Sequence, residues 1–140
     1  MHTERDPIFD HFDEVLSPGG RSLGAELLEY DKVEMRVRMS FDMTSQFTNI
    51  LGNVHGGYVA AMLDEVAGMA AKLTLPLTKA VPTLSFNVTF LAPAPVGRII
   101  GEGRVIKLGR TTAVLEARVM VPDGKVVALM TVTAAVIDIA

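Results

Sequence analysis

The sequence predicts an α+β fold in which a curved antiparallel sheet wraps around one long central helix. Three observations support this prediction. A run of helix formers near the middle of the chain is apolar on almost every side, as a helix enclosed by other structure would be. The segments after it alternate apolar and polar residues with the period of two that strands have. Short turns separate these segments, so the strands should form hairpins and pair antiparallel.

The N-terminal part of the chain predicts a short helix and then a strand. Residues 6–16 are amphipathic, with Asp6 as the N-cap and Pro7 at the first helical position. The sequence Ser-Pro-Gly-Gly at residues 17–20 should end this helix. Apolar and charged residues alternate in residues 33–40, which predicts a strand with one solvated face.

The central helix is predicted from about Gly57 to Leu73, after a loop over residues 41–53. Its apolar residues go most of the way round the helix, so the sheet should surround it. The alanines of this helix, together with Gly68, should let the sheet approach closely.

Four strands are predicted after the helix. Residues 83–90 place Leu, Phe, Val and Phe on one face and Thr, Ser and Asn on the other. Three further strand-like segments follow at residues 98–108, 111–121 and 125–137, separated by turns that contain glycine. The predicted order is therefore one strand, one long helix and four strands.

Composition and charge exclude several classes of protein. The chain has 140 residues, 49% of them hydrophobic and 21% charged, with a net charge of −3, which is typical of one globular domain. It has no basic run, so we expect no nucleic-acid partner. The uncharged stretches at 80–96 and 126–137 are too short to span a bilayer, and the N-terminus lacks the apolar segment of a signal peptide, which predicts a cytoplasmic protein without a membrane partner. The absence of cysteine excludes disulfides, thiolate metal sites and a cysteine nucleophile, and no residue spacing indicates a metal.

The candidate chemistry lies in Asn49, His55, Gly56, Gly57 and Asp64. Considered one at a time, each residue could have a purely structural role: in a turn, in a hydrogen bond that fixes the loop, or in a surface ion pair. A carboxylate on a buried helix is costly, however, unless it is paired or faces a site. The helix N-terminus after two glycines offers free N–H groups and the positive end of a dipole to an oxyanion. A carboxylate base and an oxyanion site are the two halves of an acyl-transfer site.

The two halves are too far apart for one helix to supply both. Eight residues separate Gly56 from Asp64, which is roughly 12 Å along a helix axis. Both groups must come within about 3 Å of the reacting atoms. The sequence therefore predicts a symmetric homodimer in which Asp64 of one chain meets Gly56 of the other.

These residues resemble the hotdog-fold acyl-CoA thioesterases, in particular the phenylacetic-acid-pathway branch. The pattern of that family is an Asn six residues before His-Gly-Gly and an acid nine residues after the His, which Asn49, His55 and Asp64 match. Residues 82–97 look like the family's strand after the helix, with Thr83 at the position that faces the site, and residues 107–114 are similar to its coenzyme A hairpin. The resemblance implies a thioesterase domain over residues 21–140, and the amphipathic pattern described above assigns residues 1–20 to a separate N-terminal helical segment.

The resemblance also implies a role for each residue. The Gly56 N–H would polarise the thioester carbonyl, with Asn49 and His55 shaping that loop, and Asp64 from the partner would act as base or nucleophile. Thr83 would help to hold the attacking water. The remaining substrate contacts would come from four residues, Gly57, Gly109, Arg110 and Thr111. Family members are commonly tetramers built from dimers, so a homotetramer is implied, and hydrolysis would need no cofactor beyond the coenzyme A of the substrate.

Three functions remain open on this pattern. The leading one is hydrolysis of an aromatic or medium-chain acyl-CoA, with Asp64 and not the adjacent Glu65 as the acid, because a step of 100° along a helix points Glu65 elsewhere. A hotdog enoyl-thioester hydratase or dehydratase would instead use a histidine to abstract a carbon-bound proton. A non-catalytic acyl-thioester-binding domain would keep only the fold and the pocket. Five apolar residues could line an acyl pocket or belong to the core: Phe47, Tyr58, Met62, Met69 and Phe86.

Overall fold

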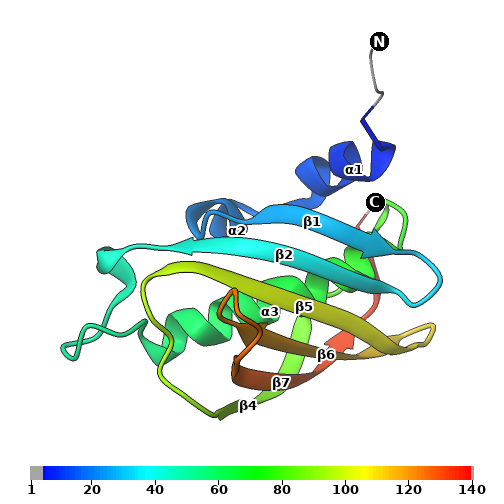
Figure 1. Ribbon diagram of the computed structural model, residues 1–140. Helices are drawn as coiled ribbons and strands as arrows, with labels where there is room; N and C mark the ends of the chain where they lie inside the picture. The colour runs from blue at the N-terminus through cyan, green and yellow to red at the C-terminus, as the bar shows by residue number, and fades with distance from the viewer. Residues whose placement is uncertain (1–4, 140) are drawn as a thin grey trace.

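The computed structural model describes residues 5–139 and confirms the predicted α+β class. A six-stranded antiparallel sheet with strand order β1-β2-β5-β6-β7-β4 curves around one long helix (Figure 1). Its strands are β1 (Glu26–Asp31), β2 (Arg36–Met43), β4 (Thr83–Phe90), β5 (Gly97–Leu108), β6 (Thr112–Met120) and β7 (Val126–Ala135). A separate two-stranded pair consists of β3 (Lys79–Ala80) and β8 (Ile137–Asp138). The helices are α1 (Pro7–Val15), α2 (Pro18–Ser22), the 3-10 turn η1 (Ser45–Phe47) and α3 (Gly56–Lys72).

Helix α3 is the predicted central helix, and each of its ends lies within one residue of the prediction. Its buried side chains are Val59, Met62, Leu63, Val66, Ala67, Met69, Ala70 and Ala71. The close approach of helix and sheet depends on glycines of β5, since a Cβ atom on Gly103 would lie 2.1 Å from the carbonyl oxygen of Val66. The prediction that Gly68 serves this purpose is wrong. A Cβ atom there would meet only the Lys72 Cε, at 4.0 Å.

Replacing Gly103 with Ala should therefore destabilise the protein. The new methyl group cannot fit against the helix backbone, so α3 must shift from the sheet at a cost of roughly 2–3 kcal/mol. For a domain of this size, this lowers the midpoint of thermal unfolding by about 7–10 °C. Differential scanning calorimetry measures the change, with Gly19→Ala as the control because a Cβ atom on Gly19 meets only Ser17 Oγ, at 3.7 Å. Equal midpoints for the two variants would contradict this account of the packing.

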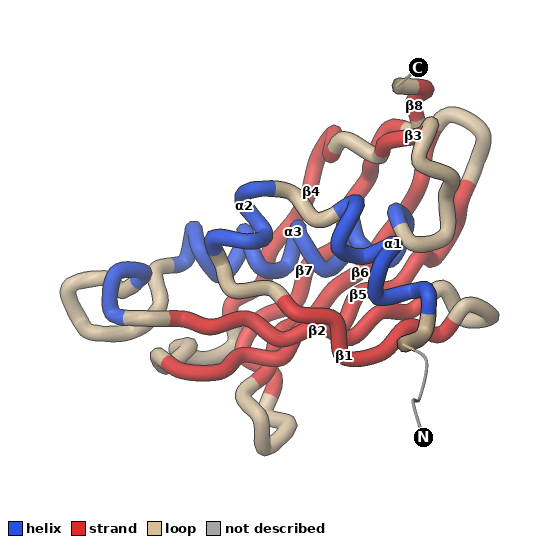
Figure 2. Tube along the Cα trace, turned by 90° about the horizontal axis from the view of Figure 1, so that it is seen from above, coloured by secondary structure: helices blue, strands red, loops and turns tan. Residues whose placement is uncertain are grey.

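The N-terminal segment forms two helices instead of one. Helix α1 begins as predicted, with Pro7 at its first position and Asp6 Oδ1 accepting from the Ile8 N–H at 2.9 Å. The Ser-Pro-Gly-Gly stretch does end α1, but it then begins α2, because Ser17 Oγ accepts from the Gly20 N–H and caps a new helical turn. Both helices lie beside α3 (Figure 2), where Ser17 Oγ donates to Glu65 Oε1 at 2.8 Å.

The strands before α3 differ from the prediction. Strand β1 was not predicted, and β2 begins at Arg36 instead of residue 33 and continues through residues 41–43 of the predicted loop. The cause is a turn around Asp31, whose Oδ1 accepts from the N–H groups of Val33 and Glu34 at 3.0 and 3.1 Å. Met35 in this turn has a positive φ of 51°. The alternating residues 33–35 therefore lie in a turn and not in a strand.

The four predicted strands after α3 correspond to β4, β5, β6 and β7 within two residues at each end, whereas the short pair of β3 and β8 was not predicted. Strand β4 lies at the edge of the sheet. One side of it pairs with β7, from Thr83 opposite Ala134 to Phe90 opposite Ala128, and its other side pairs with no strand of residues 5–139. Helices long and apolar enough to cross a membrane are absent from residues 5–139.

Candidate functional site

The loop before α3 is held in shape by Asn49. Its side-chain Oδ1 accepts from the Leu51 N–H at 3.0 Å and from the Asn53 N–H at 3.2 Å. Its backbone N–H donates to Asn53 O at 2.8 Å, and the Gly52 N–H donates to Asn49 O at 3.0 Å. Gly52 has a φ of 84°, which the turn requires and glycine accepts without strain. Asn49 therefore closes a rigid turn directly before the helix.

His55 caps the N-terminus of α3. Its Nδ1 accepts from the Gly57 N–H at 3.1 Å, so the neutral ring carries its proton on Nε2. The Gly57 N–H is thus engaged within the chain. The Gly56 N–H, in contrast, donates to no acceptor of residues 5–139. The donor left for a ligand at this end of the helix is the one that the sequence predicts, Gly56.

Asp64 lies two turns along α3 and is half-buried. Thr83, at the start of β4, donates from its Oγ1 to Asp64 Oδ1 at 2.8 Å. This contact joins residues 19 positions apart and leaves Oδ2 of the carboxylate free for another partner. The two side chains face an open hollow of about 340 Å³ beside the helix, lined by Asp64, Glu65, Gly68, Lys72, Ala80, Val81, Pro82, Thr83 and Ile137.

Gly68 lines this hollow and places no side chain in it. A glycine inside a helix costs about 1 kcal/mol relative to alanine. No backbone approaches Gly68 closely enough to require it, since the nearest atom to its missing Cβ would be the flexible end of Lys72. The helix therefore carries an opening one turn beyond Asp64, on the same side of the helix.

Glu65 does not share the position of Asp64. Its Oε1 accepts from Ser17 Oγ, and its Oε2 is buried without a partner among residues 5–139. A Cβ atom on Gly20 would lie 2.8 Å from that oxygen, so the carboxyl group is enclosed by α2. The carboxyl group of Glu65 is therefore directed at α2, as expected from its position on the helix, although the residue also lines the hollow beside Asp64.

The hairpin of Gly109, Arg110 and Thr111 joins β5 to β6. The Gly109 N–H donates to Thr112 O and the Val136 N–H donates to Thr111 O, both at 2.9 Å. Thr83 pairs with Ala134, which pairs with Ala113, so the hairpin lies at the same end of the sheet as Thr83. Arg110 is exposed there. The hairpin does not contact Asp64 in the single chain, and its role stays a prediction.

Strand β4 touches both halves of the predicted site. Its first residue, Thr83, bonds to Asp64, and its last residue, Phe90, places its ring where a Cβ atom on Gly56 would lie 3.4 Å from Cζ. Within one chain the two halves stay at opposite ends of this strand. Of the five candidate acyl-pocket residues, Phe47, Met62 and Met69 are buried in the core, whereas Tyr58 and Phe86 are exposed.

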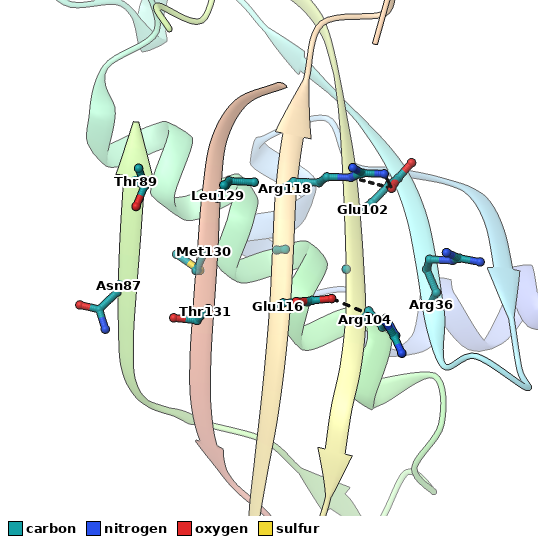
Figure 3. Close-up of a pocket in the computed structure, with 12 residues that line it drawn as sticks. Arg36, Asn87, Thr89, Glu102, Arg104, Glu116, Arg118, Leu129, Met130 and Thr131 are labelled. Carbon is teal, nitrogen blue, oxygen red and sulfur yellow. Dashed lines mark hydrogen bonds and ion pairs between the residues drawn. The ribbon is translucent and has the colours of Figure 1, made fainter. Parts of the chain in front are cut away.

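Another hollow, of about 540 Å³, lies on the outer face of the sheet (Figure 3). Its carboxylates are held by arginines: Arg118 donates to Glu102 Oε2 at 2.7 and 2.9 Å, and Arg104 lies 3.8 Å from Glu116. Asp64 and Gly56 do not line it. Both of its carboxylates are paired with arginines and no helix begins there, so it lacks the two groups that the sequence predicts for acyl transfer.

Comparison with known proteins adds the family context. The profile of the thioesterase superfamily matches residues 51–128. A Halobacterium salinarum protein, whose name assigns it provisionally as an esterase, is 34% identical over 105 residues, which is 71% of this chain and 68% of that protein. Mouse acyl-coenzyme A thioesterase 13 is 35% identical over 71 residues, so the match spans only 49% of each protein.

The fold is also similar to a solved structure. A phenylacetic acid degradation-related protein from Ralstonia eutropha superposes with a TM-score of 0.83 at 30% identity, covering 91% of this chain and 98% of that one. The matched segment contains His55, Gly56 and Asp64, which supply the helix cap, the free N–H group and the carboxylate described above.

Proposed function

This chain belongs to the thioesterase superfamily of hydrolases, and we propose that it hydrolyses acyl-CoA thioesters at a composite site between two copies. The observation that carries the proposal is the pair of half-sites on α3: a free Gly56 N–H at its start, and an Asp64 carboxylate, oriented by Thr83, two turns on. Each half-site is incomplete in one chain. Together they supply the donor and the base that thioester hydrolysis needs.

The edge strand supports the dimer. Residues 83–90 contain no charged residue and no proline, although exposed edges normally carry such residues to prevent pairing. Leu84 is 62% exposed and Phe90 is 55% exposed in the single chain. An uncharged edge with exposed apolar side chains is what a second copy would cover.

Pairing of two β4 strands would also join the half-sites. Thr83 and Phe90 are equally far from the midpoint between Phe86 and Asn87. Antiparallel pairing about that midpoint sets Thr83 of one chain opposite Phe90 of the other. Because Thr83 bonds to Asp64 and Phe90 lies at Gly56, this register brings Asp64 toward the Gly56 of the second chain. Two such dimers would form the homotetramer that the family resemblance implies.

The chemistry at this site would be as follows. Asp64 Oδ2 takes a proton from water as the water oxygen attacks the thioester carbonyl carbon. The negative charge that develops on the carbonyl oxygen is stabilised by the Gly56 N–H and by the helix dipole. The C–S bond then breaks, and coenzyme A leaves as the thiol with the proton. Water and the thioester balance the reaction, so no cofactor is required.

The hydrogen bonding of His55 favours hydrolysis over the hydratase alternative. His55 Nδ1 is occupied by the Gly57 N–H, and its other nitrogen carries the proton, so the ring has no free lone pair to abstract a carbon-bound proton. A hydratase mechanism therefore lacks its base.

Tyr58 and Phe86 offer exposed apolar surface near the site, which supports an aromatic or medium-chain acyl group.

A panel of acyl-CoA thioesters tests the proposal, with acetyl-, octanoyl- and phenylacetyl-CoA and a thiol reagent as the readout. The chain has no cysteine, so the reagent reports only the released coenzyme A. We expect turnover of at least one member, together with a dimer or tetramer in light scattering. Absence of turnover across the panel, or a strict monomer, would refute the proposed function.

A further inference from the structure

The turn before α3 presents two large aliphatic side chains to solvent. Ile50 is 101% exposed and Leu51 is 81% exposed. The turn itself is rigid, because Asn49 accepts two backbone N–H groups within it and Thr48 forms a bridge with Val54. A fixed turn that exposes Ile and Leu side chains to solvent in the single chain indicates a surface that a second protein chain covers. We call residues 50–51 the aliphatic tip.

The aliphatic tip projects beyond the N-terminal end of α3. In Figures 1 and 2 the loop between β2 and α3 reaches outward past the start of this helix in both views. In the proposed dimer the two α3 helices run antiparallel, with Gly56 of one beside Asp64 of the other. A segment that extends past Gly56 must then pass Asp64 of the partner and reach the next turn of the partner's helix. That turn carries Gly68, four residues and about 6 Å beyond Asp64.

The surface around Gly68 can accept the aliphatic tip of the partner. One side of the hollow is apolar, at Ala80, Val81, Pro82 and Ile137. Its other lining side chains, Asp64, Glu65, Lys72 and Thr83, are polar or charged, and the helix offers no side chain at Gly68 itself. The aliphatic side chains would thus meet the apolar side of the hollow, next to the reacting carboxylate. This is the environment that an apolar acyl group requires.

We propose that the aliphatic tip of one subunit closes the Gly68 hollow of its partner, and that the two together form the wall that holds the acyl group. This inference rests on the proposed function, and it adds Ile50, Leu51 and Gly68 as determinants of acyl specificity. It explains why a helix interior keeps a glycine that no backbone contact requires. It also explains why a rigid turn keeps two aliphatic side chains exposed in the single chain.

Disulfide trapping tests the contact between the two subunits. The chain is free of cysteine, so Leu51→Cys combined with Gly68→Cys introduces the sole reactive pair. Within one chain these positions lie at opposite ends of the helix, too far apart for a disulfide. Mild oxidation with diamide should yield a covalent dimer that a reducing agent dissolves. The control combines Gly68→Cys with Val33→Cys, which is exposed in the turn between β1 and β2. Absence of the covalent dimer, or equal trapping in the control, would overturn the contact.

Kinetics test the acyl wall separately. Removing the Leu51 side chain with Leu51→Ala should raise KM for octanoyl-CoA about tenfold more than KM for acetyl-CoA, because only the longer chain reaches the wall. Val33→Ala, the matched control, should change neither value. An equal change for both substrates would overturn the assignment to the acyl group. Failure of either test in an enzyme that still hydrolyses the panel would remove this inference and leave the proposed function standing.

Discussion

Replacing Asp64 with Asn is expected to lower kcat for acyl-CoA hydrolysis by about 10³-fold. Asparagine has nearly the same shape, and its Oδ1 can still accept from Thr83, so the site should keep its geometry. The amide cannot accept the proton of the attacking water, however. Release of coenzyme A from octanoyl-CoA, followed with a thiol reagent, measures the loss.

The neighbouring carboxylate provides the control for Asp64. Glu65→Gln changes the charge of the same helix at the adjacent position, but the Glu65 carboxyl group is held by Ser17 and enclosed by α2. We expect Glu65→Gln to retain kcat within a few-fold of the wild type. Undiminished kcat in Asp64→Asn, or an equal loss in Glu65→Gln, would remove Asp64 from the mechanism.

Replacing Gly56 with Pro should lower kcat by about 10²–10³-fold, the usual effect of removing one oxyanion donor. Proline lacks the N–H that Gly56 offers, yet it suits this place in the fold. Gly56 is the first residue of α3, where proline is favoured. His55 before it has φ −60° and ψ 138°, a conformation that the residue preceding a proline prefers. The substitution therefore removes a hydrogen-bond donor and preserves the helix.

Gly56→Ala is the matched control for this donor. Alanine keeps the N–H, and its Cβ would lie 3.4 Å from Phe90 Cζ, a contact that a small shift of the ring relieves. We expect kcat of Gly56→Ala to stay far above that of Gly56→Pro, with similar circular dichroism for both. If both variants lose activity equally, the cause is the shape of the turn and not the missing N–H.

Local patterns predicted those parts of the fold that depend on nearby residues. Helix α3 has a continuous apolar run and a clear start after His55, so its bounds were correct within one residue. Strand β1 was not predicted because its sequence, Glu-Leu-Leu-Glu-Tyr-Asp, does not alternate. Strand β2 was shifted because residues 33–35 alternate like a strand, although the Asp31 side chain bonds to the backbone and makes them a turn.

The candidate site was harder to predict than the helices, because part of it is formed by contacts between segments that are distant in the sequence. The spacing of Asn49, His55 and Asp64 marked its residues, and the separation along α3 predicted that two chains are needed. The contact of Thr83 with Asp64, and the place of Phe90 beside Gly56, arise only when β4 lies at the sheet edge. Sheet order is set by pairing between distant strands, which residue periodicity does not encode. The absence of charge and proline in residues 83–90 was the available signal that this edge could pair with a second chain, as the proposed dimer requires.

Mixing two inactive variants tests most directly whether the site is shared between chains. Asp64→Asn retains Gly56, and Gly56→Pro retains Asp64, so a mixed dimer contains one site with both native groups and one with neither. If equal amounts are unfolded together and refolded, random pairing makes half of the dimers mixed. Because one site in two is intact in half of the dimers, a shared site should recover about one quarter of the wild-type activity in the mixture. A mixture as inactive as its two components, with subunit exchange verified by mass spectrometry, would show that Asp64 and Gly56 do not complete a site across two chains and would contradict the shared site.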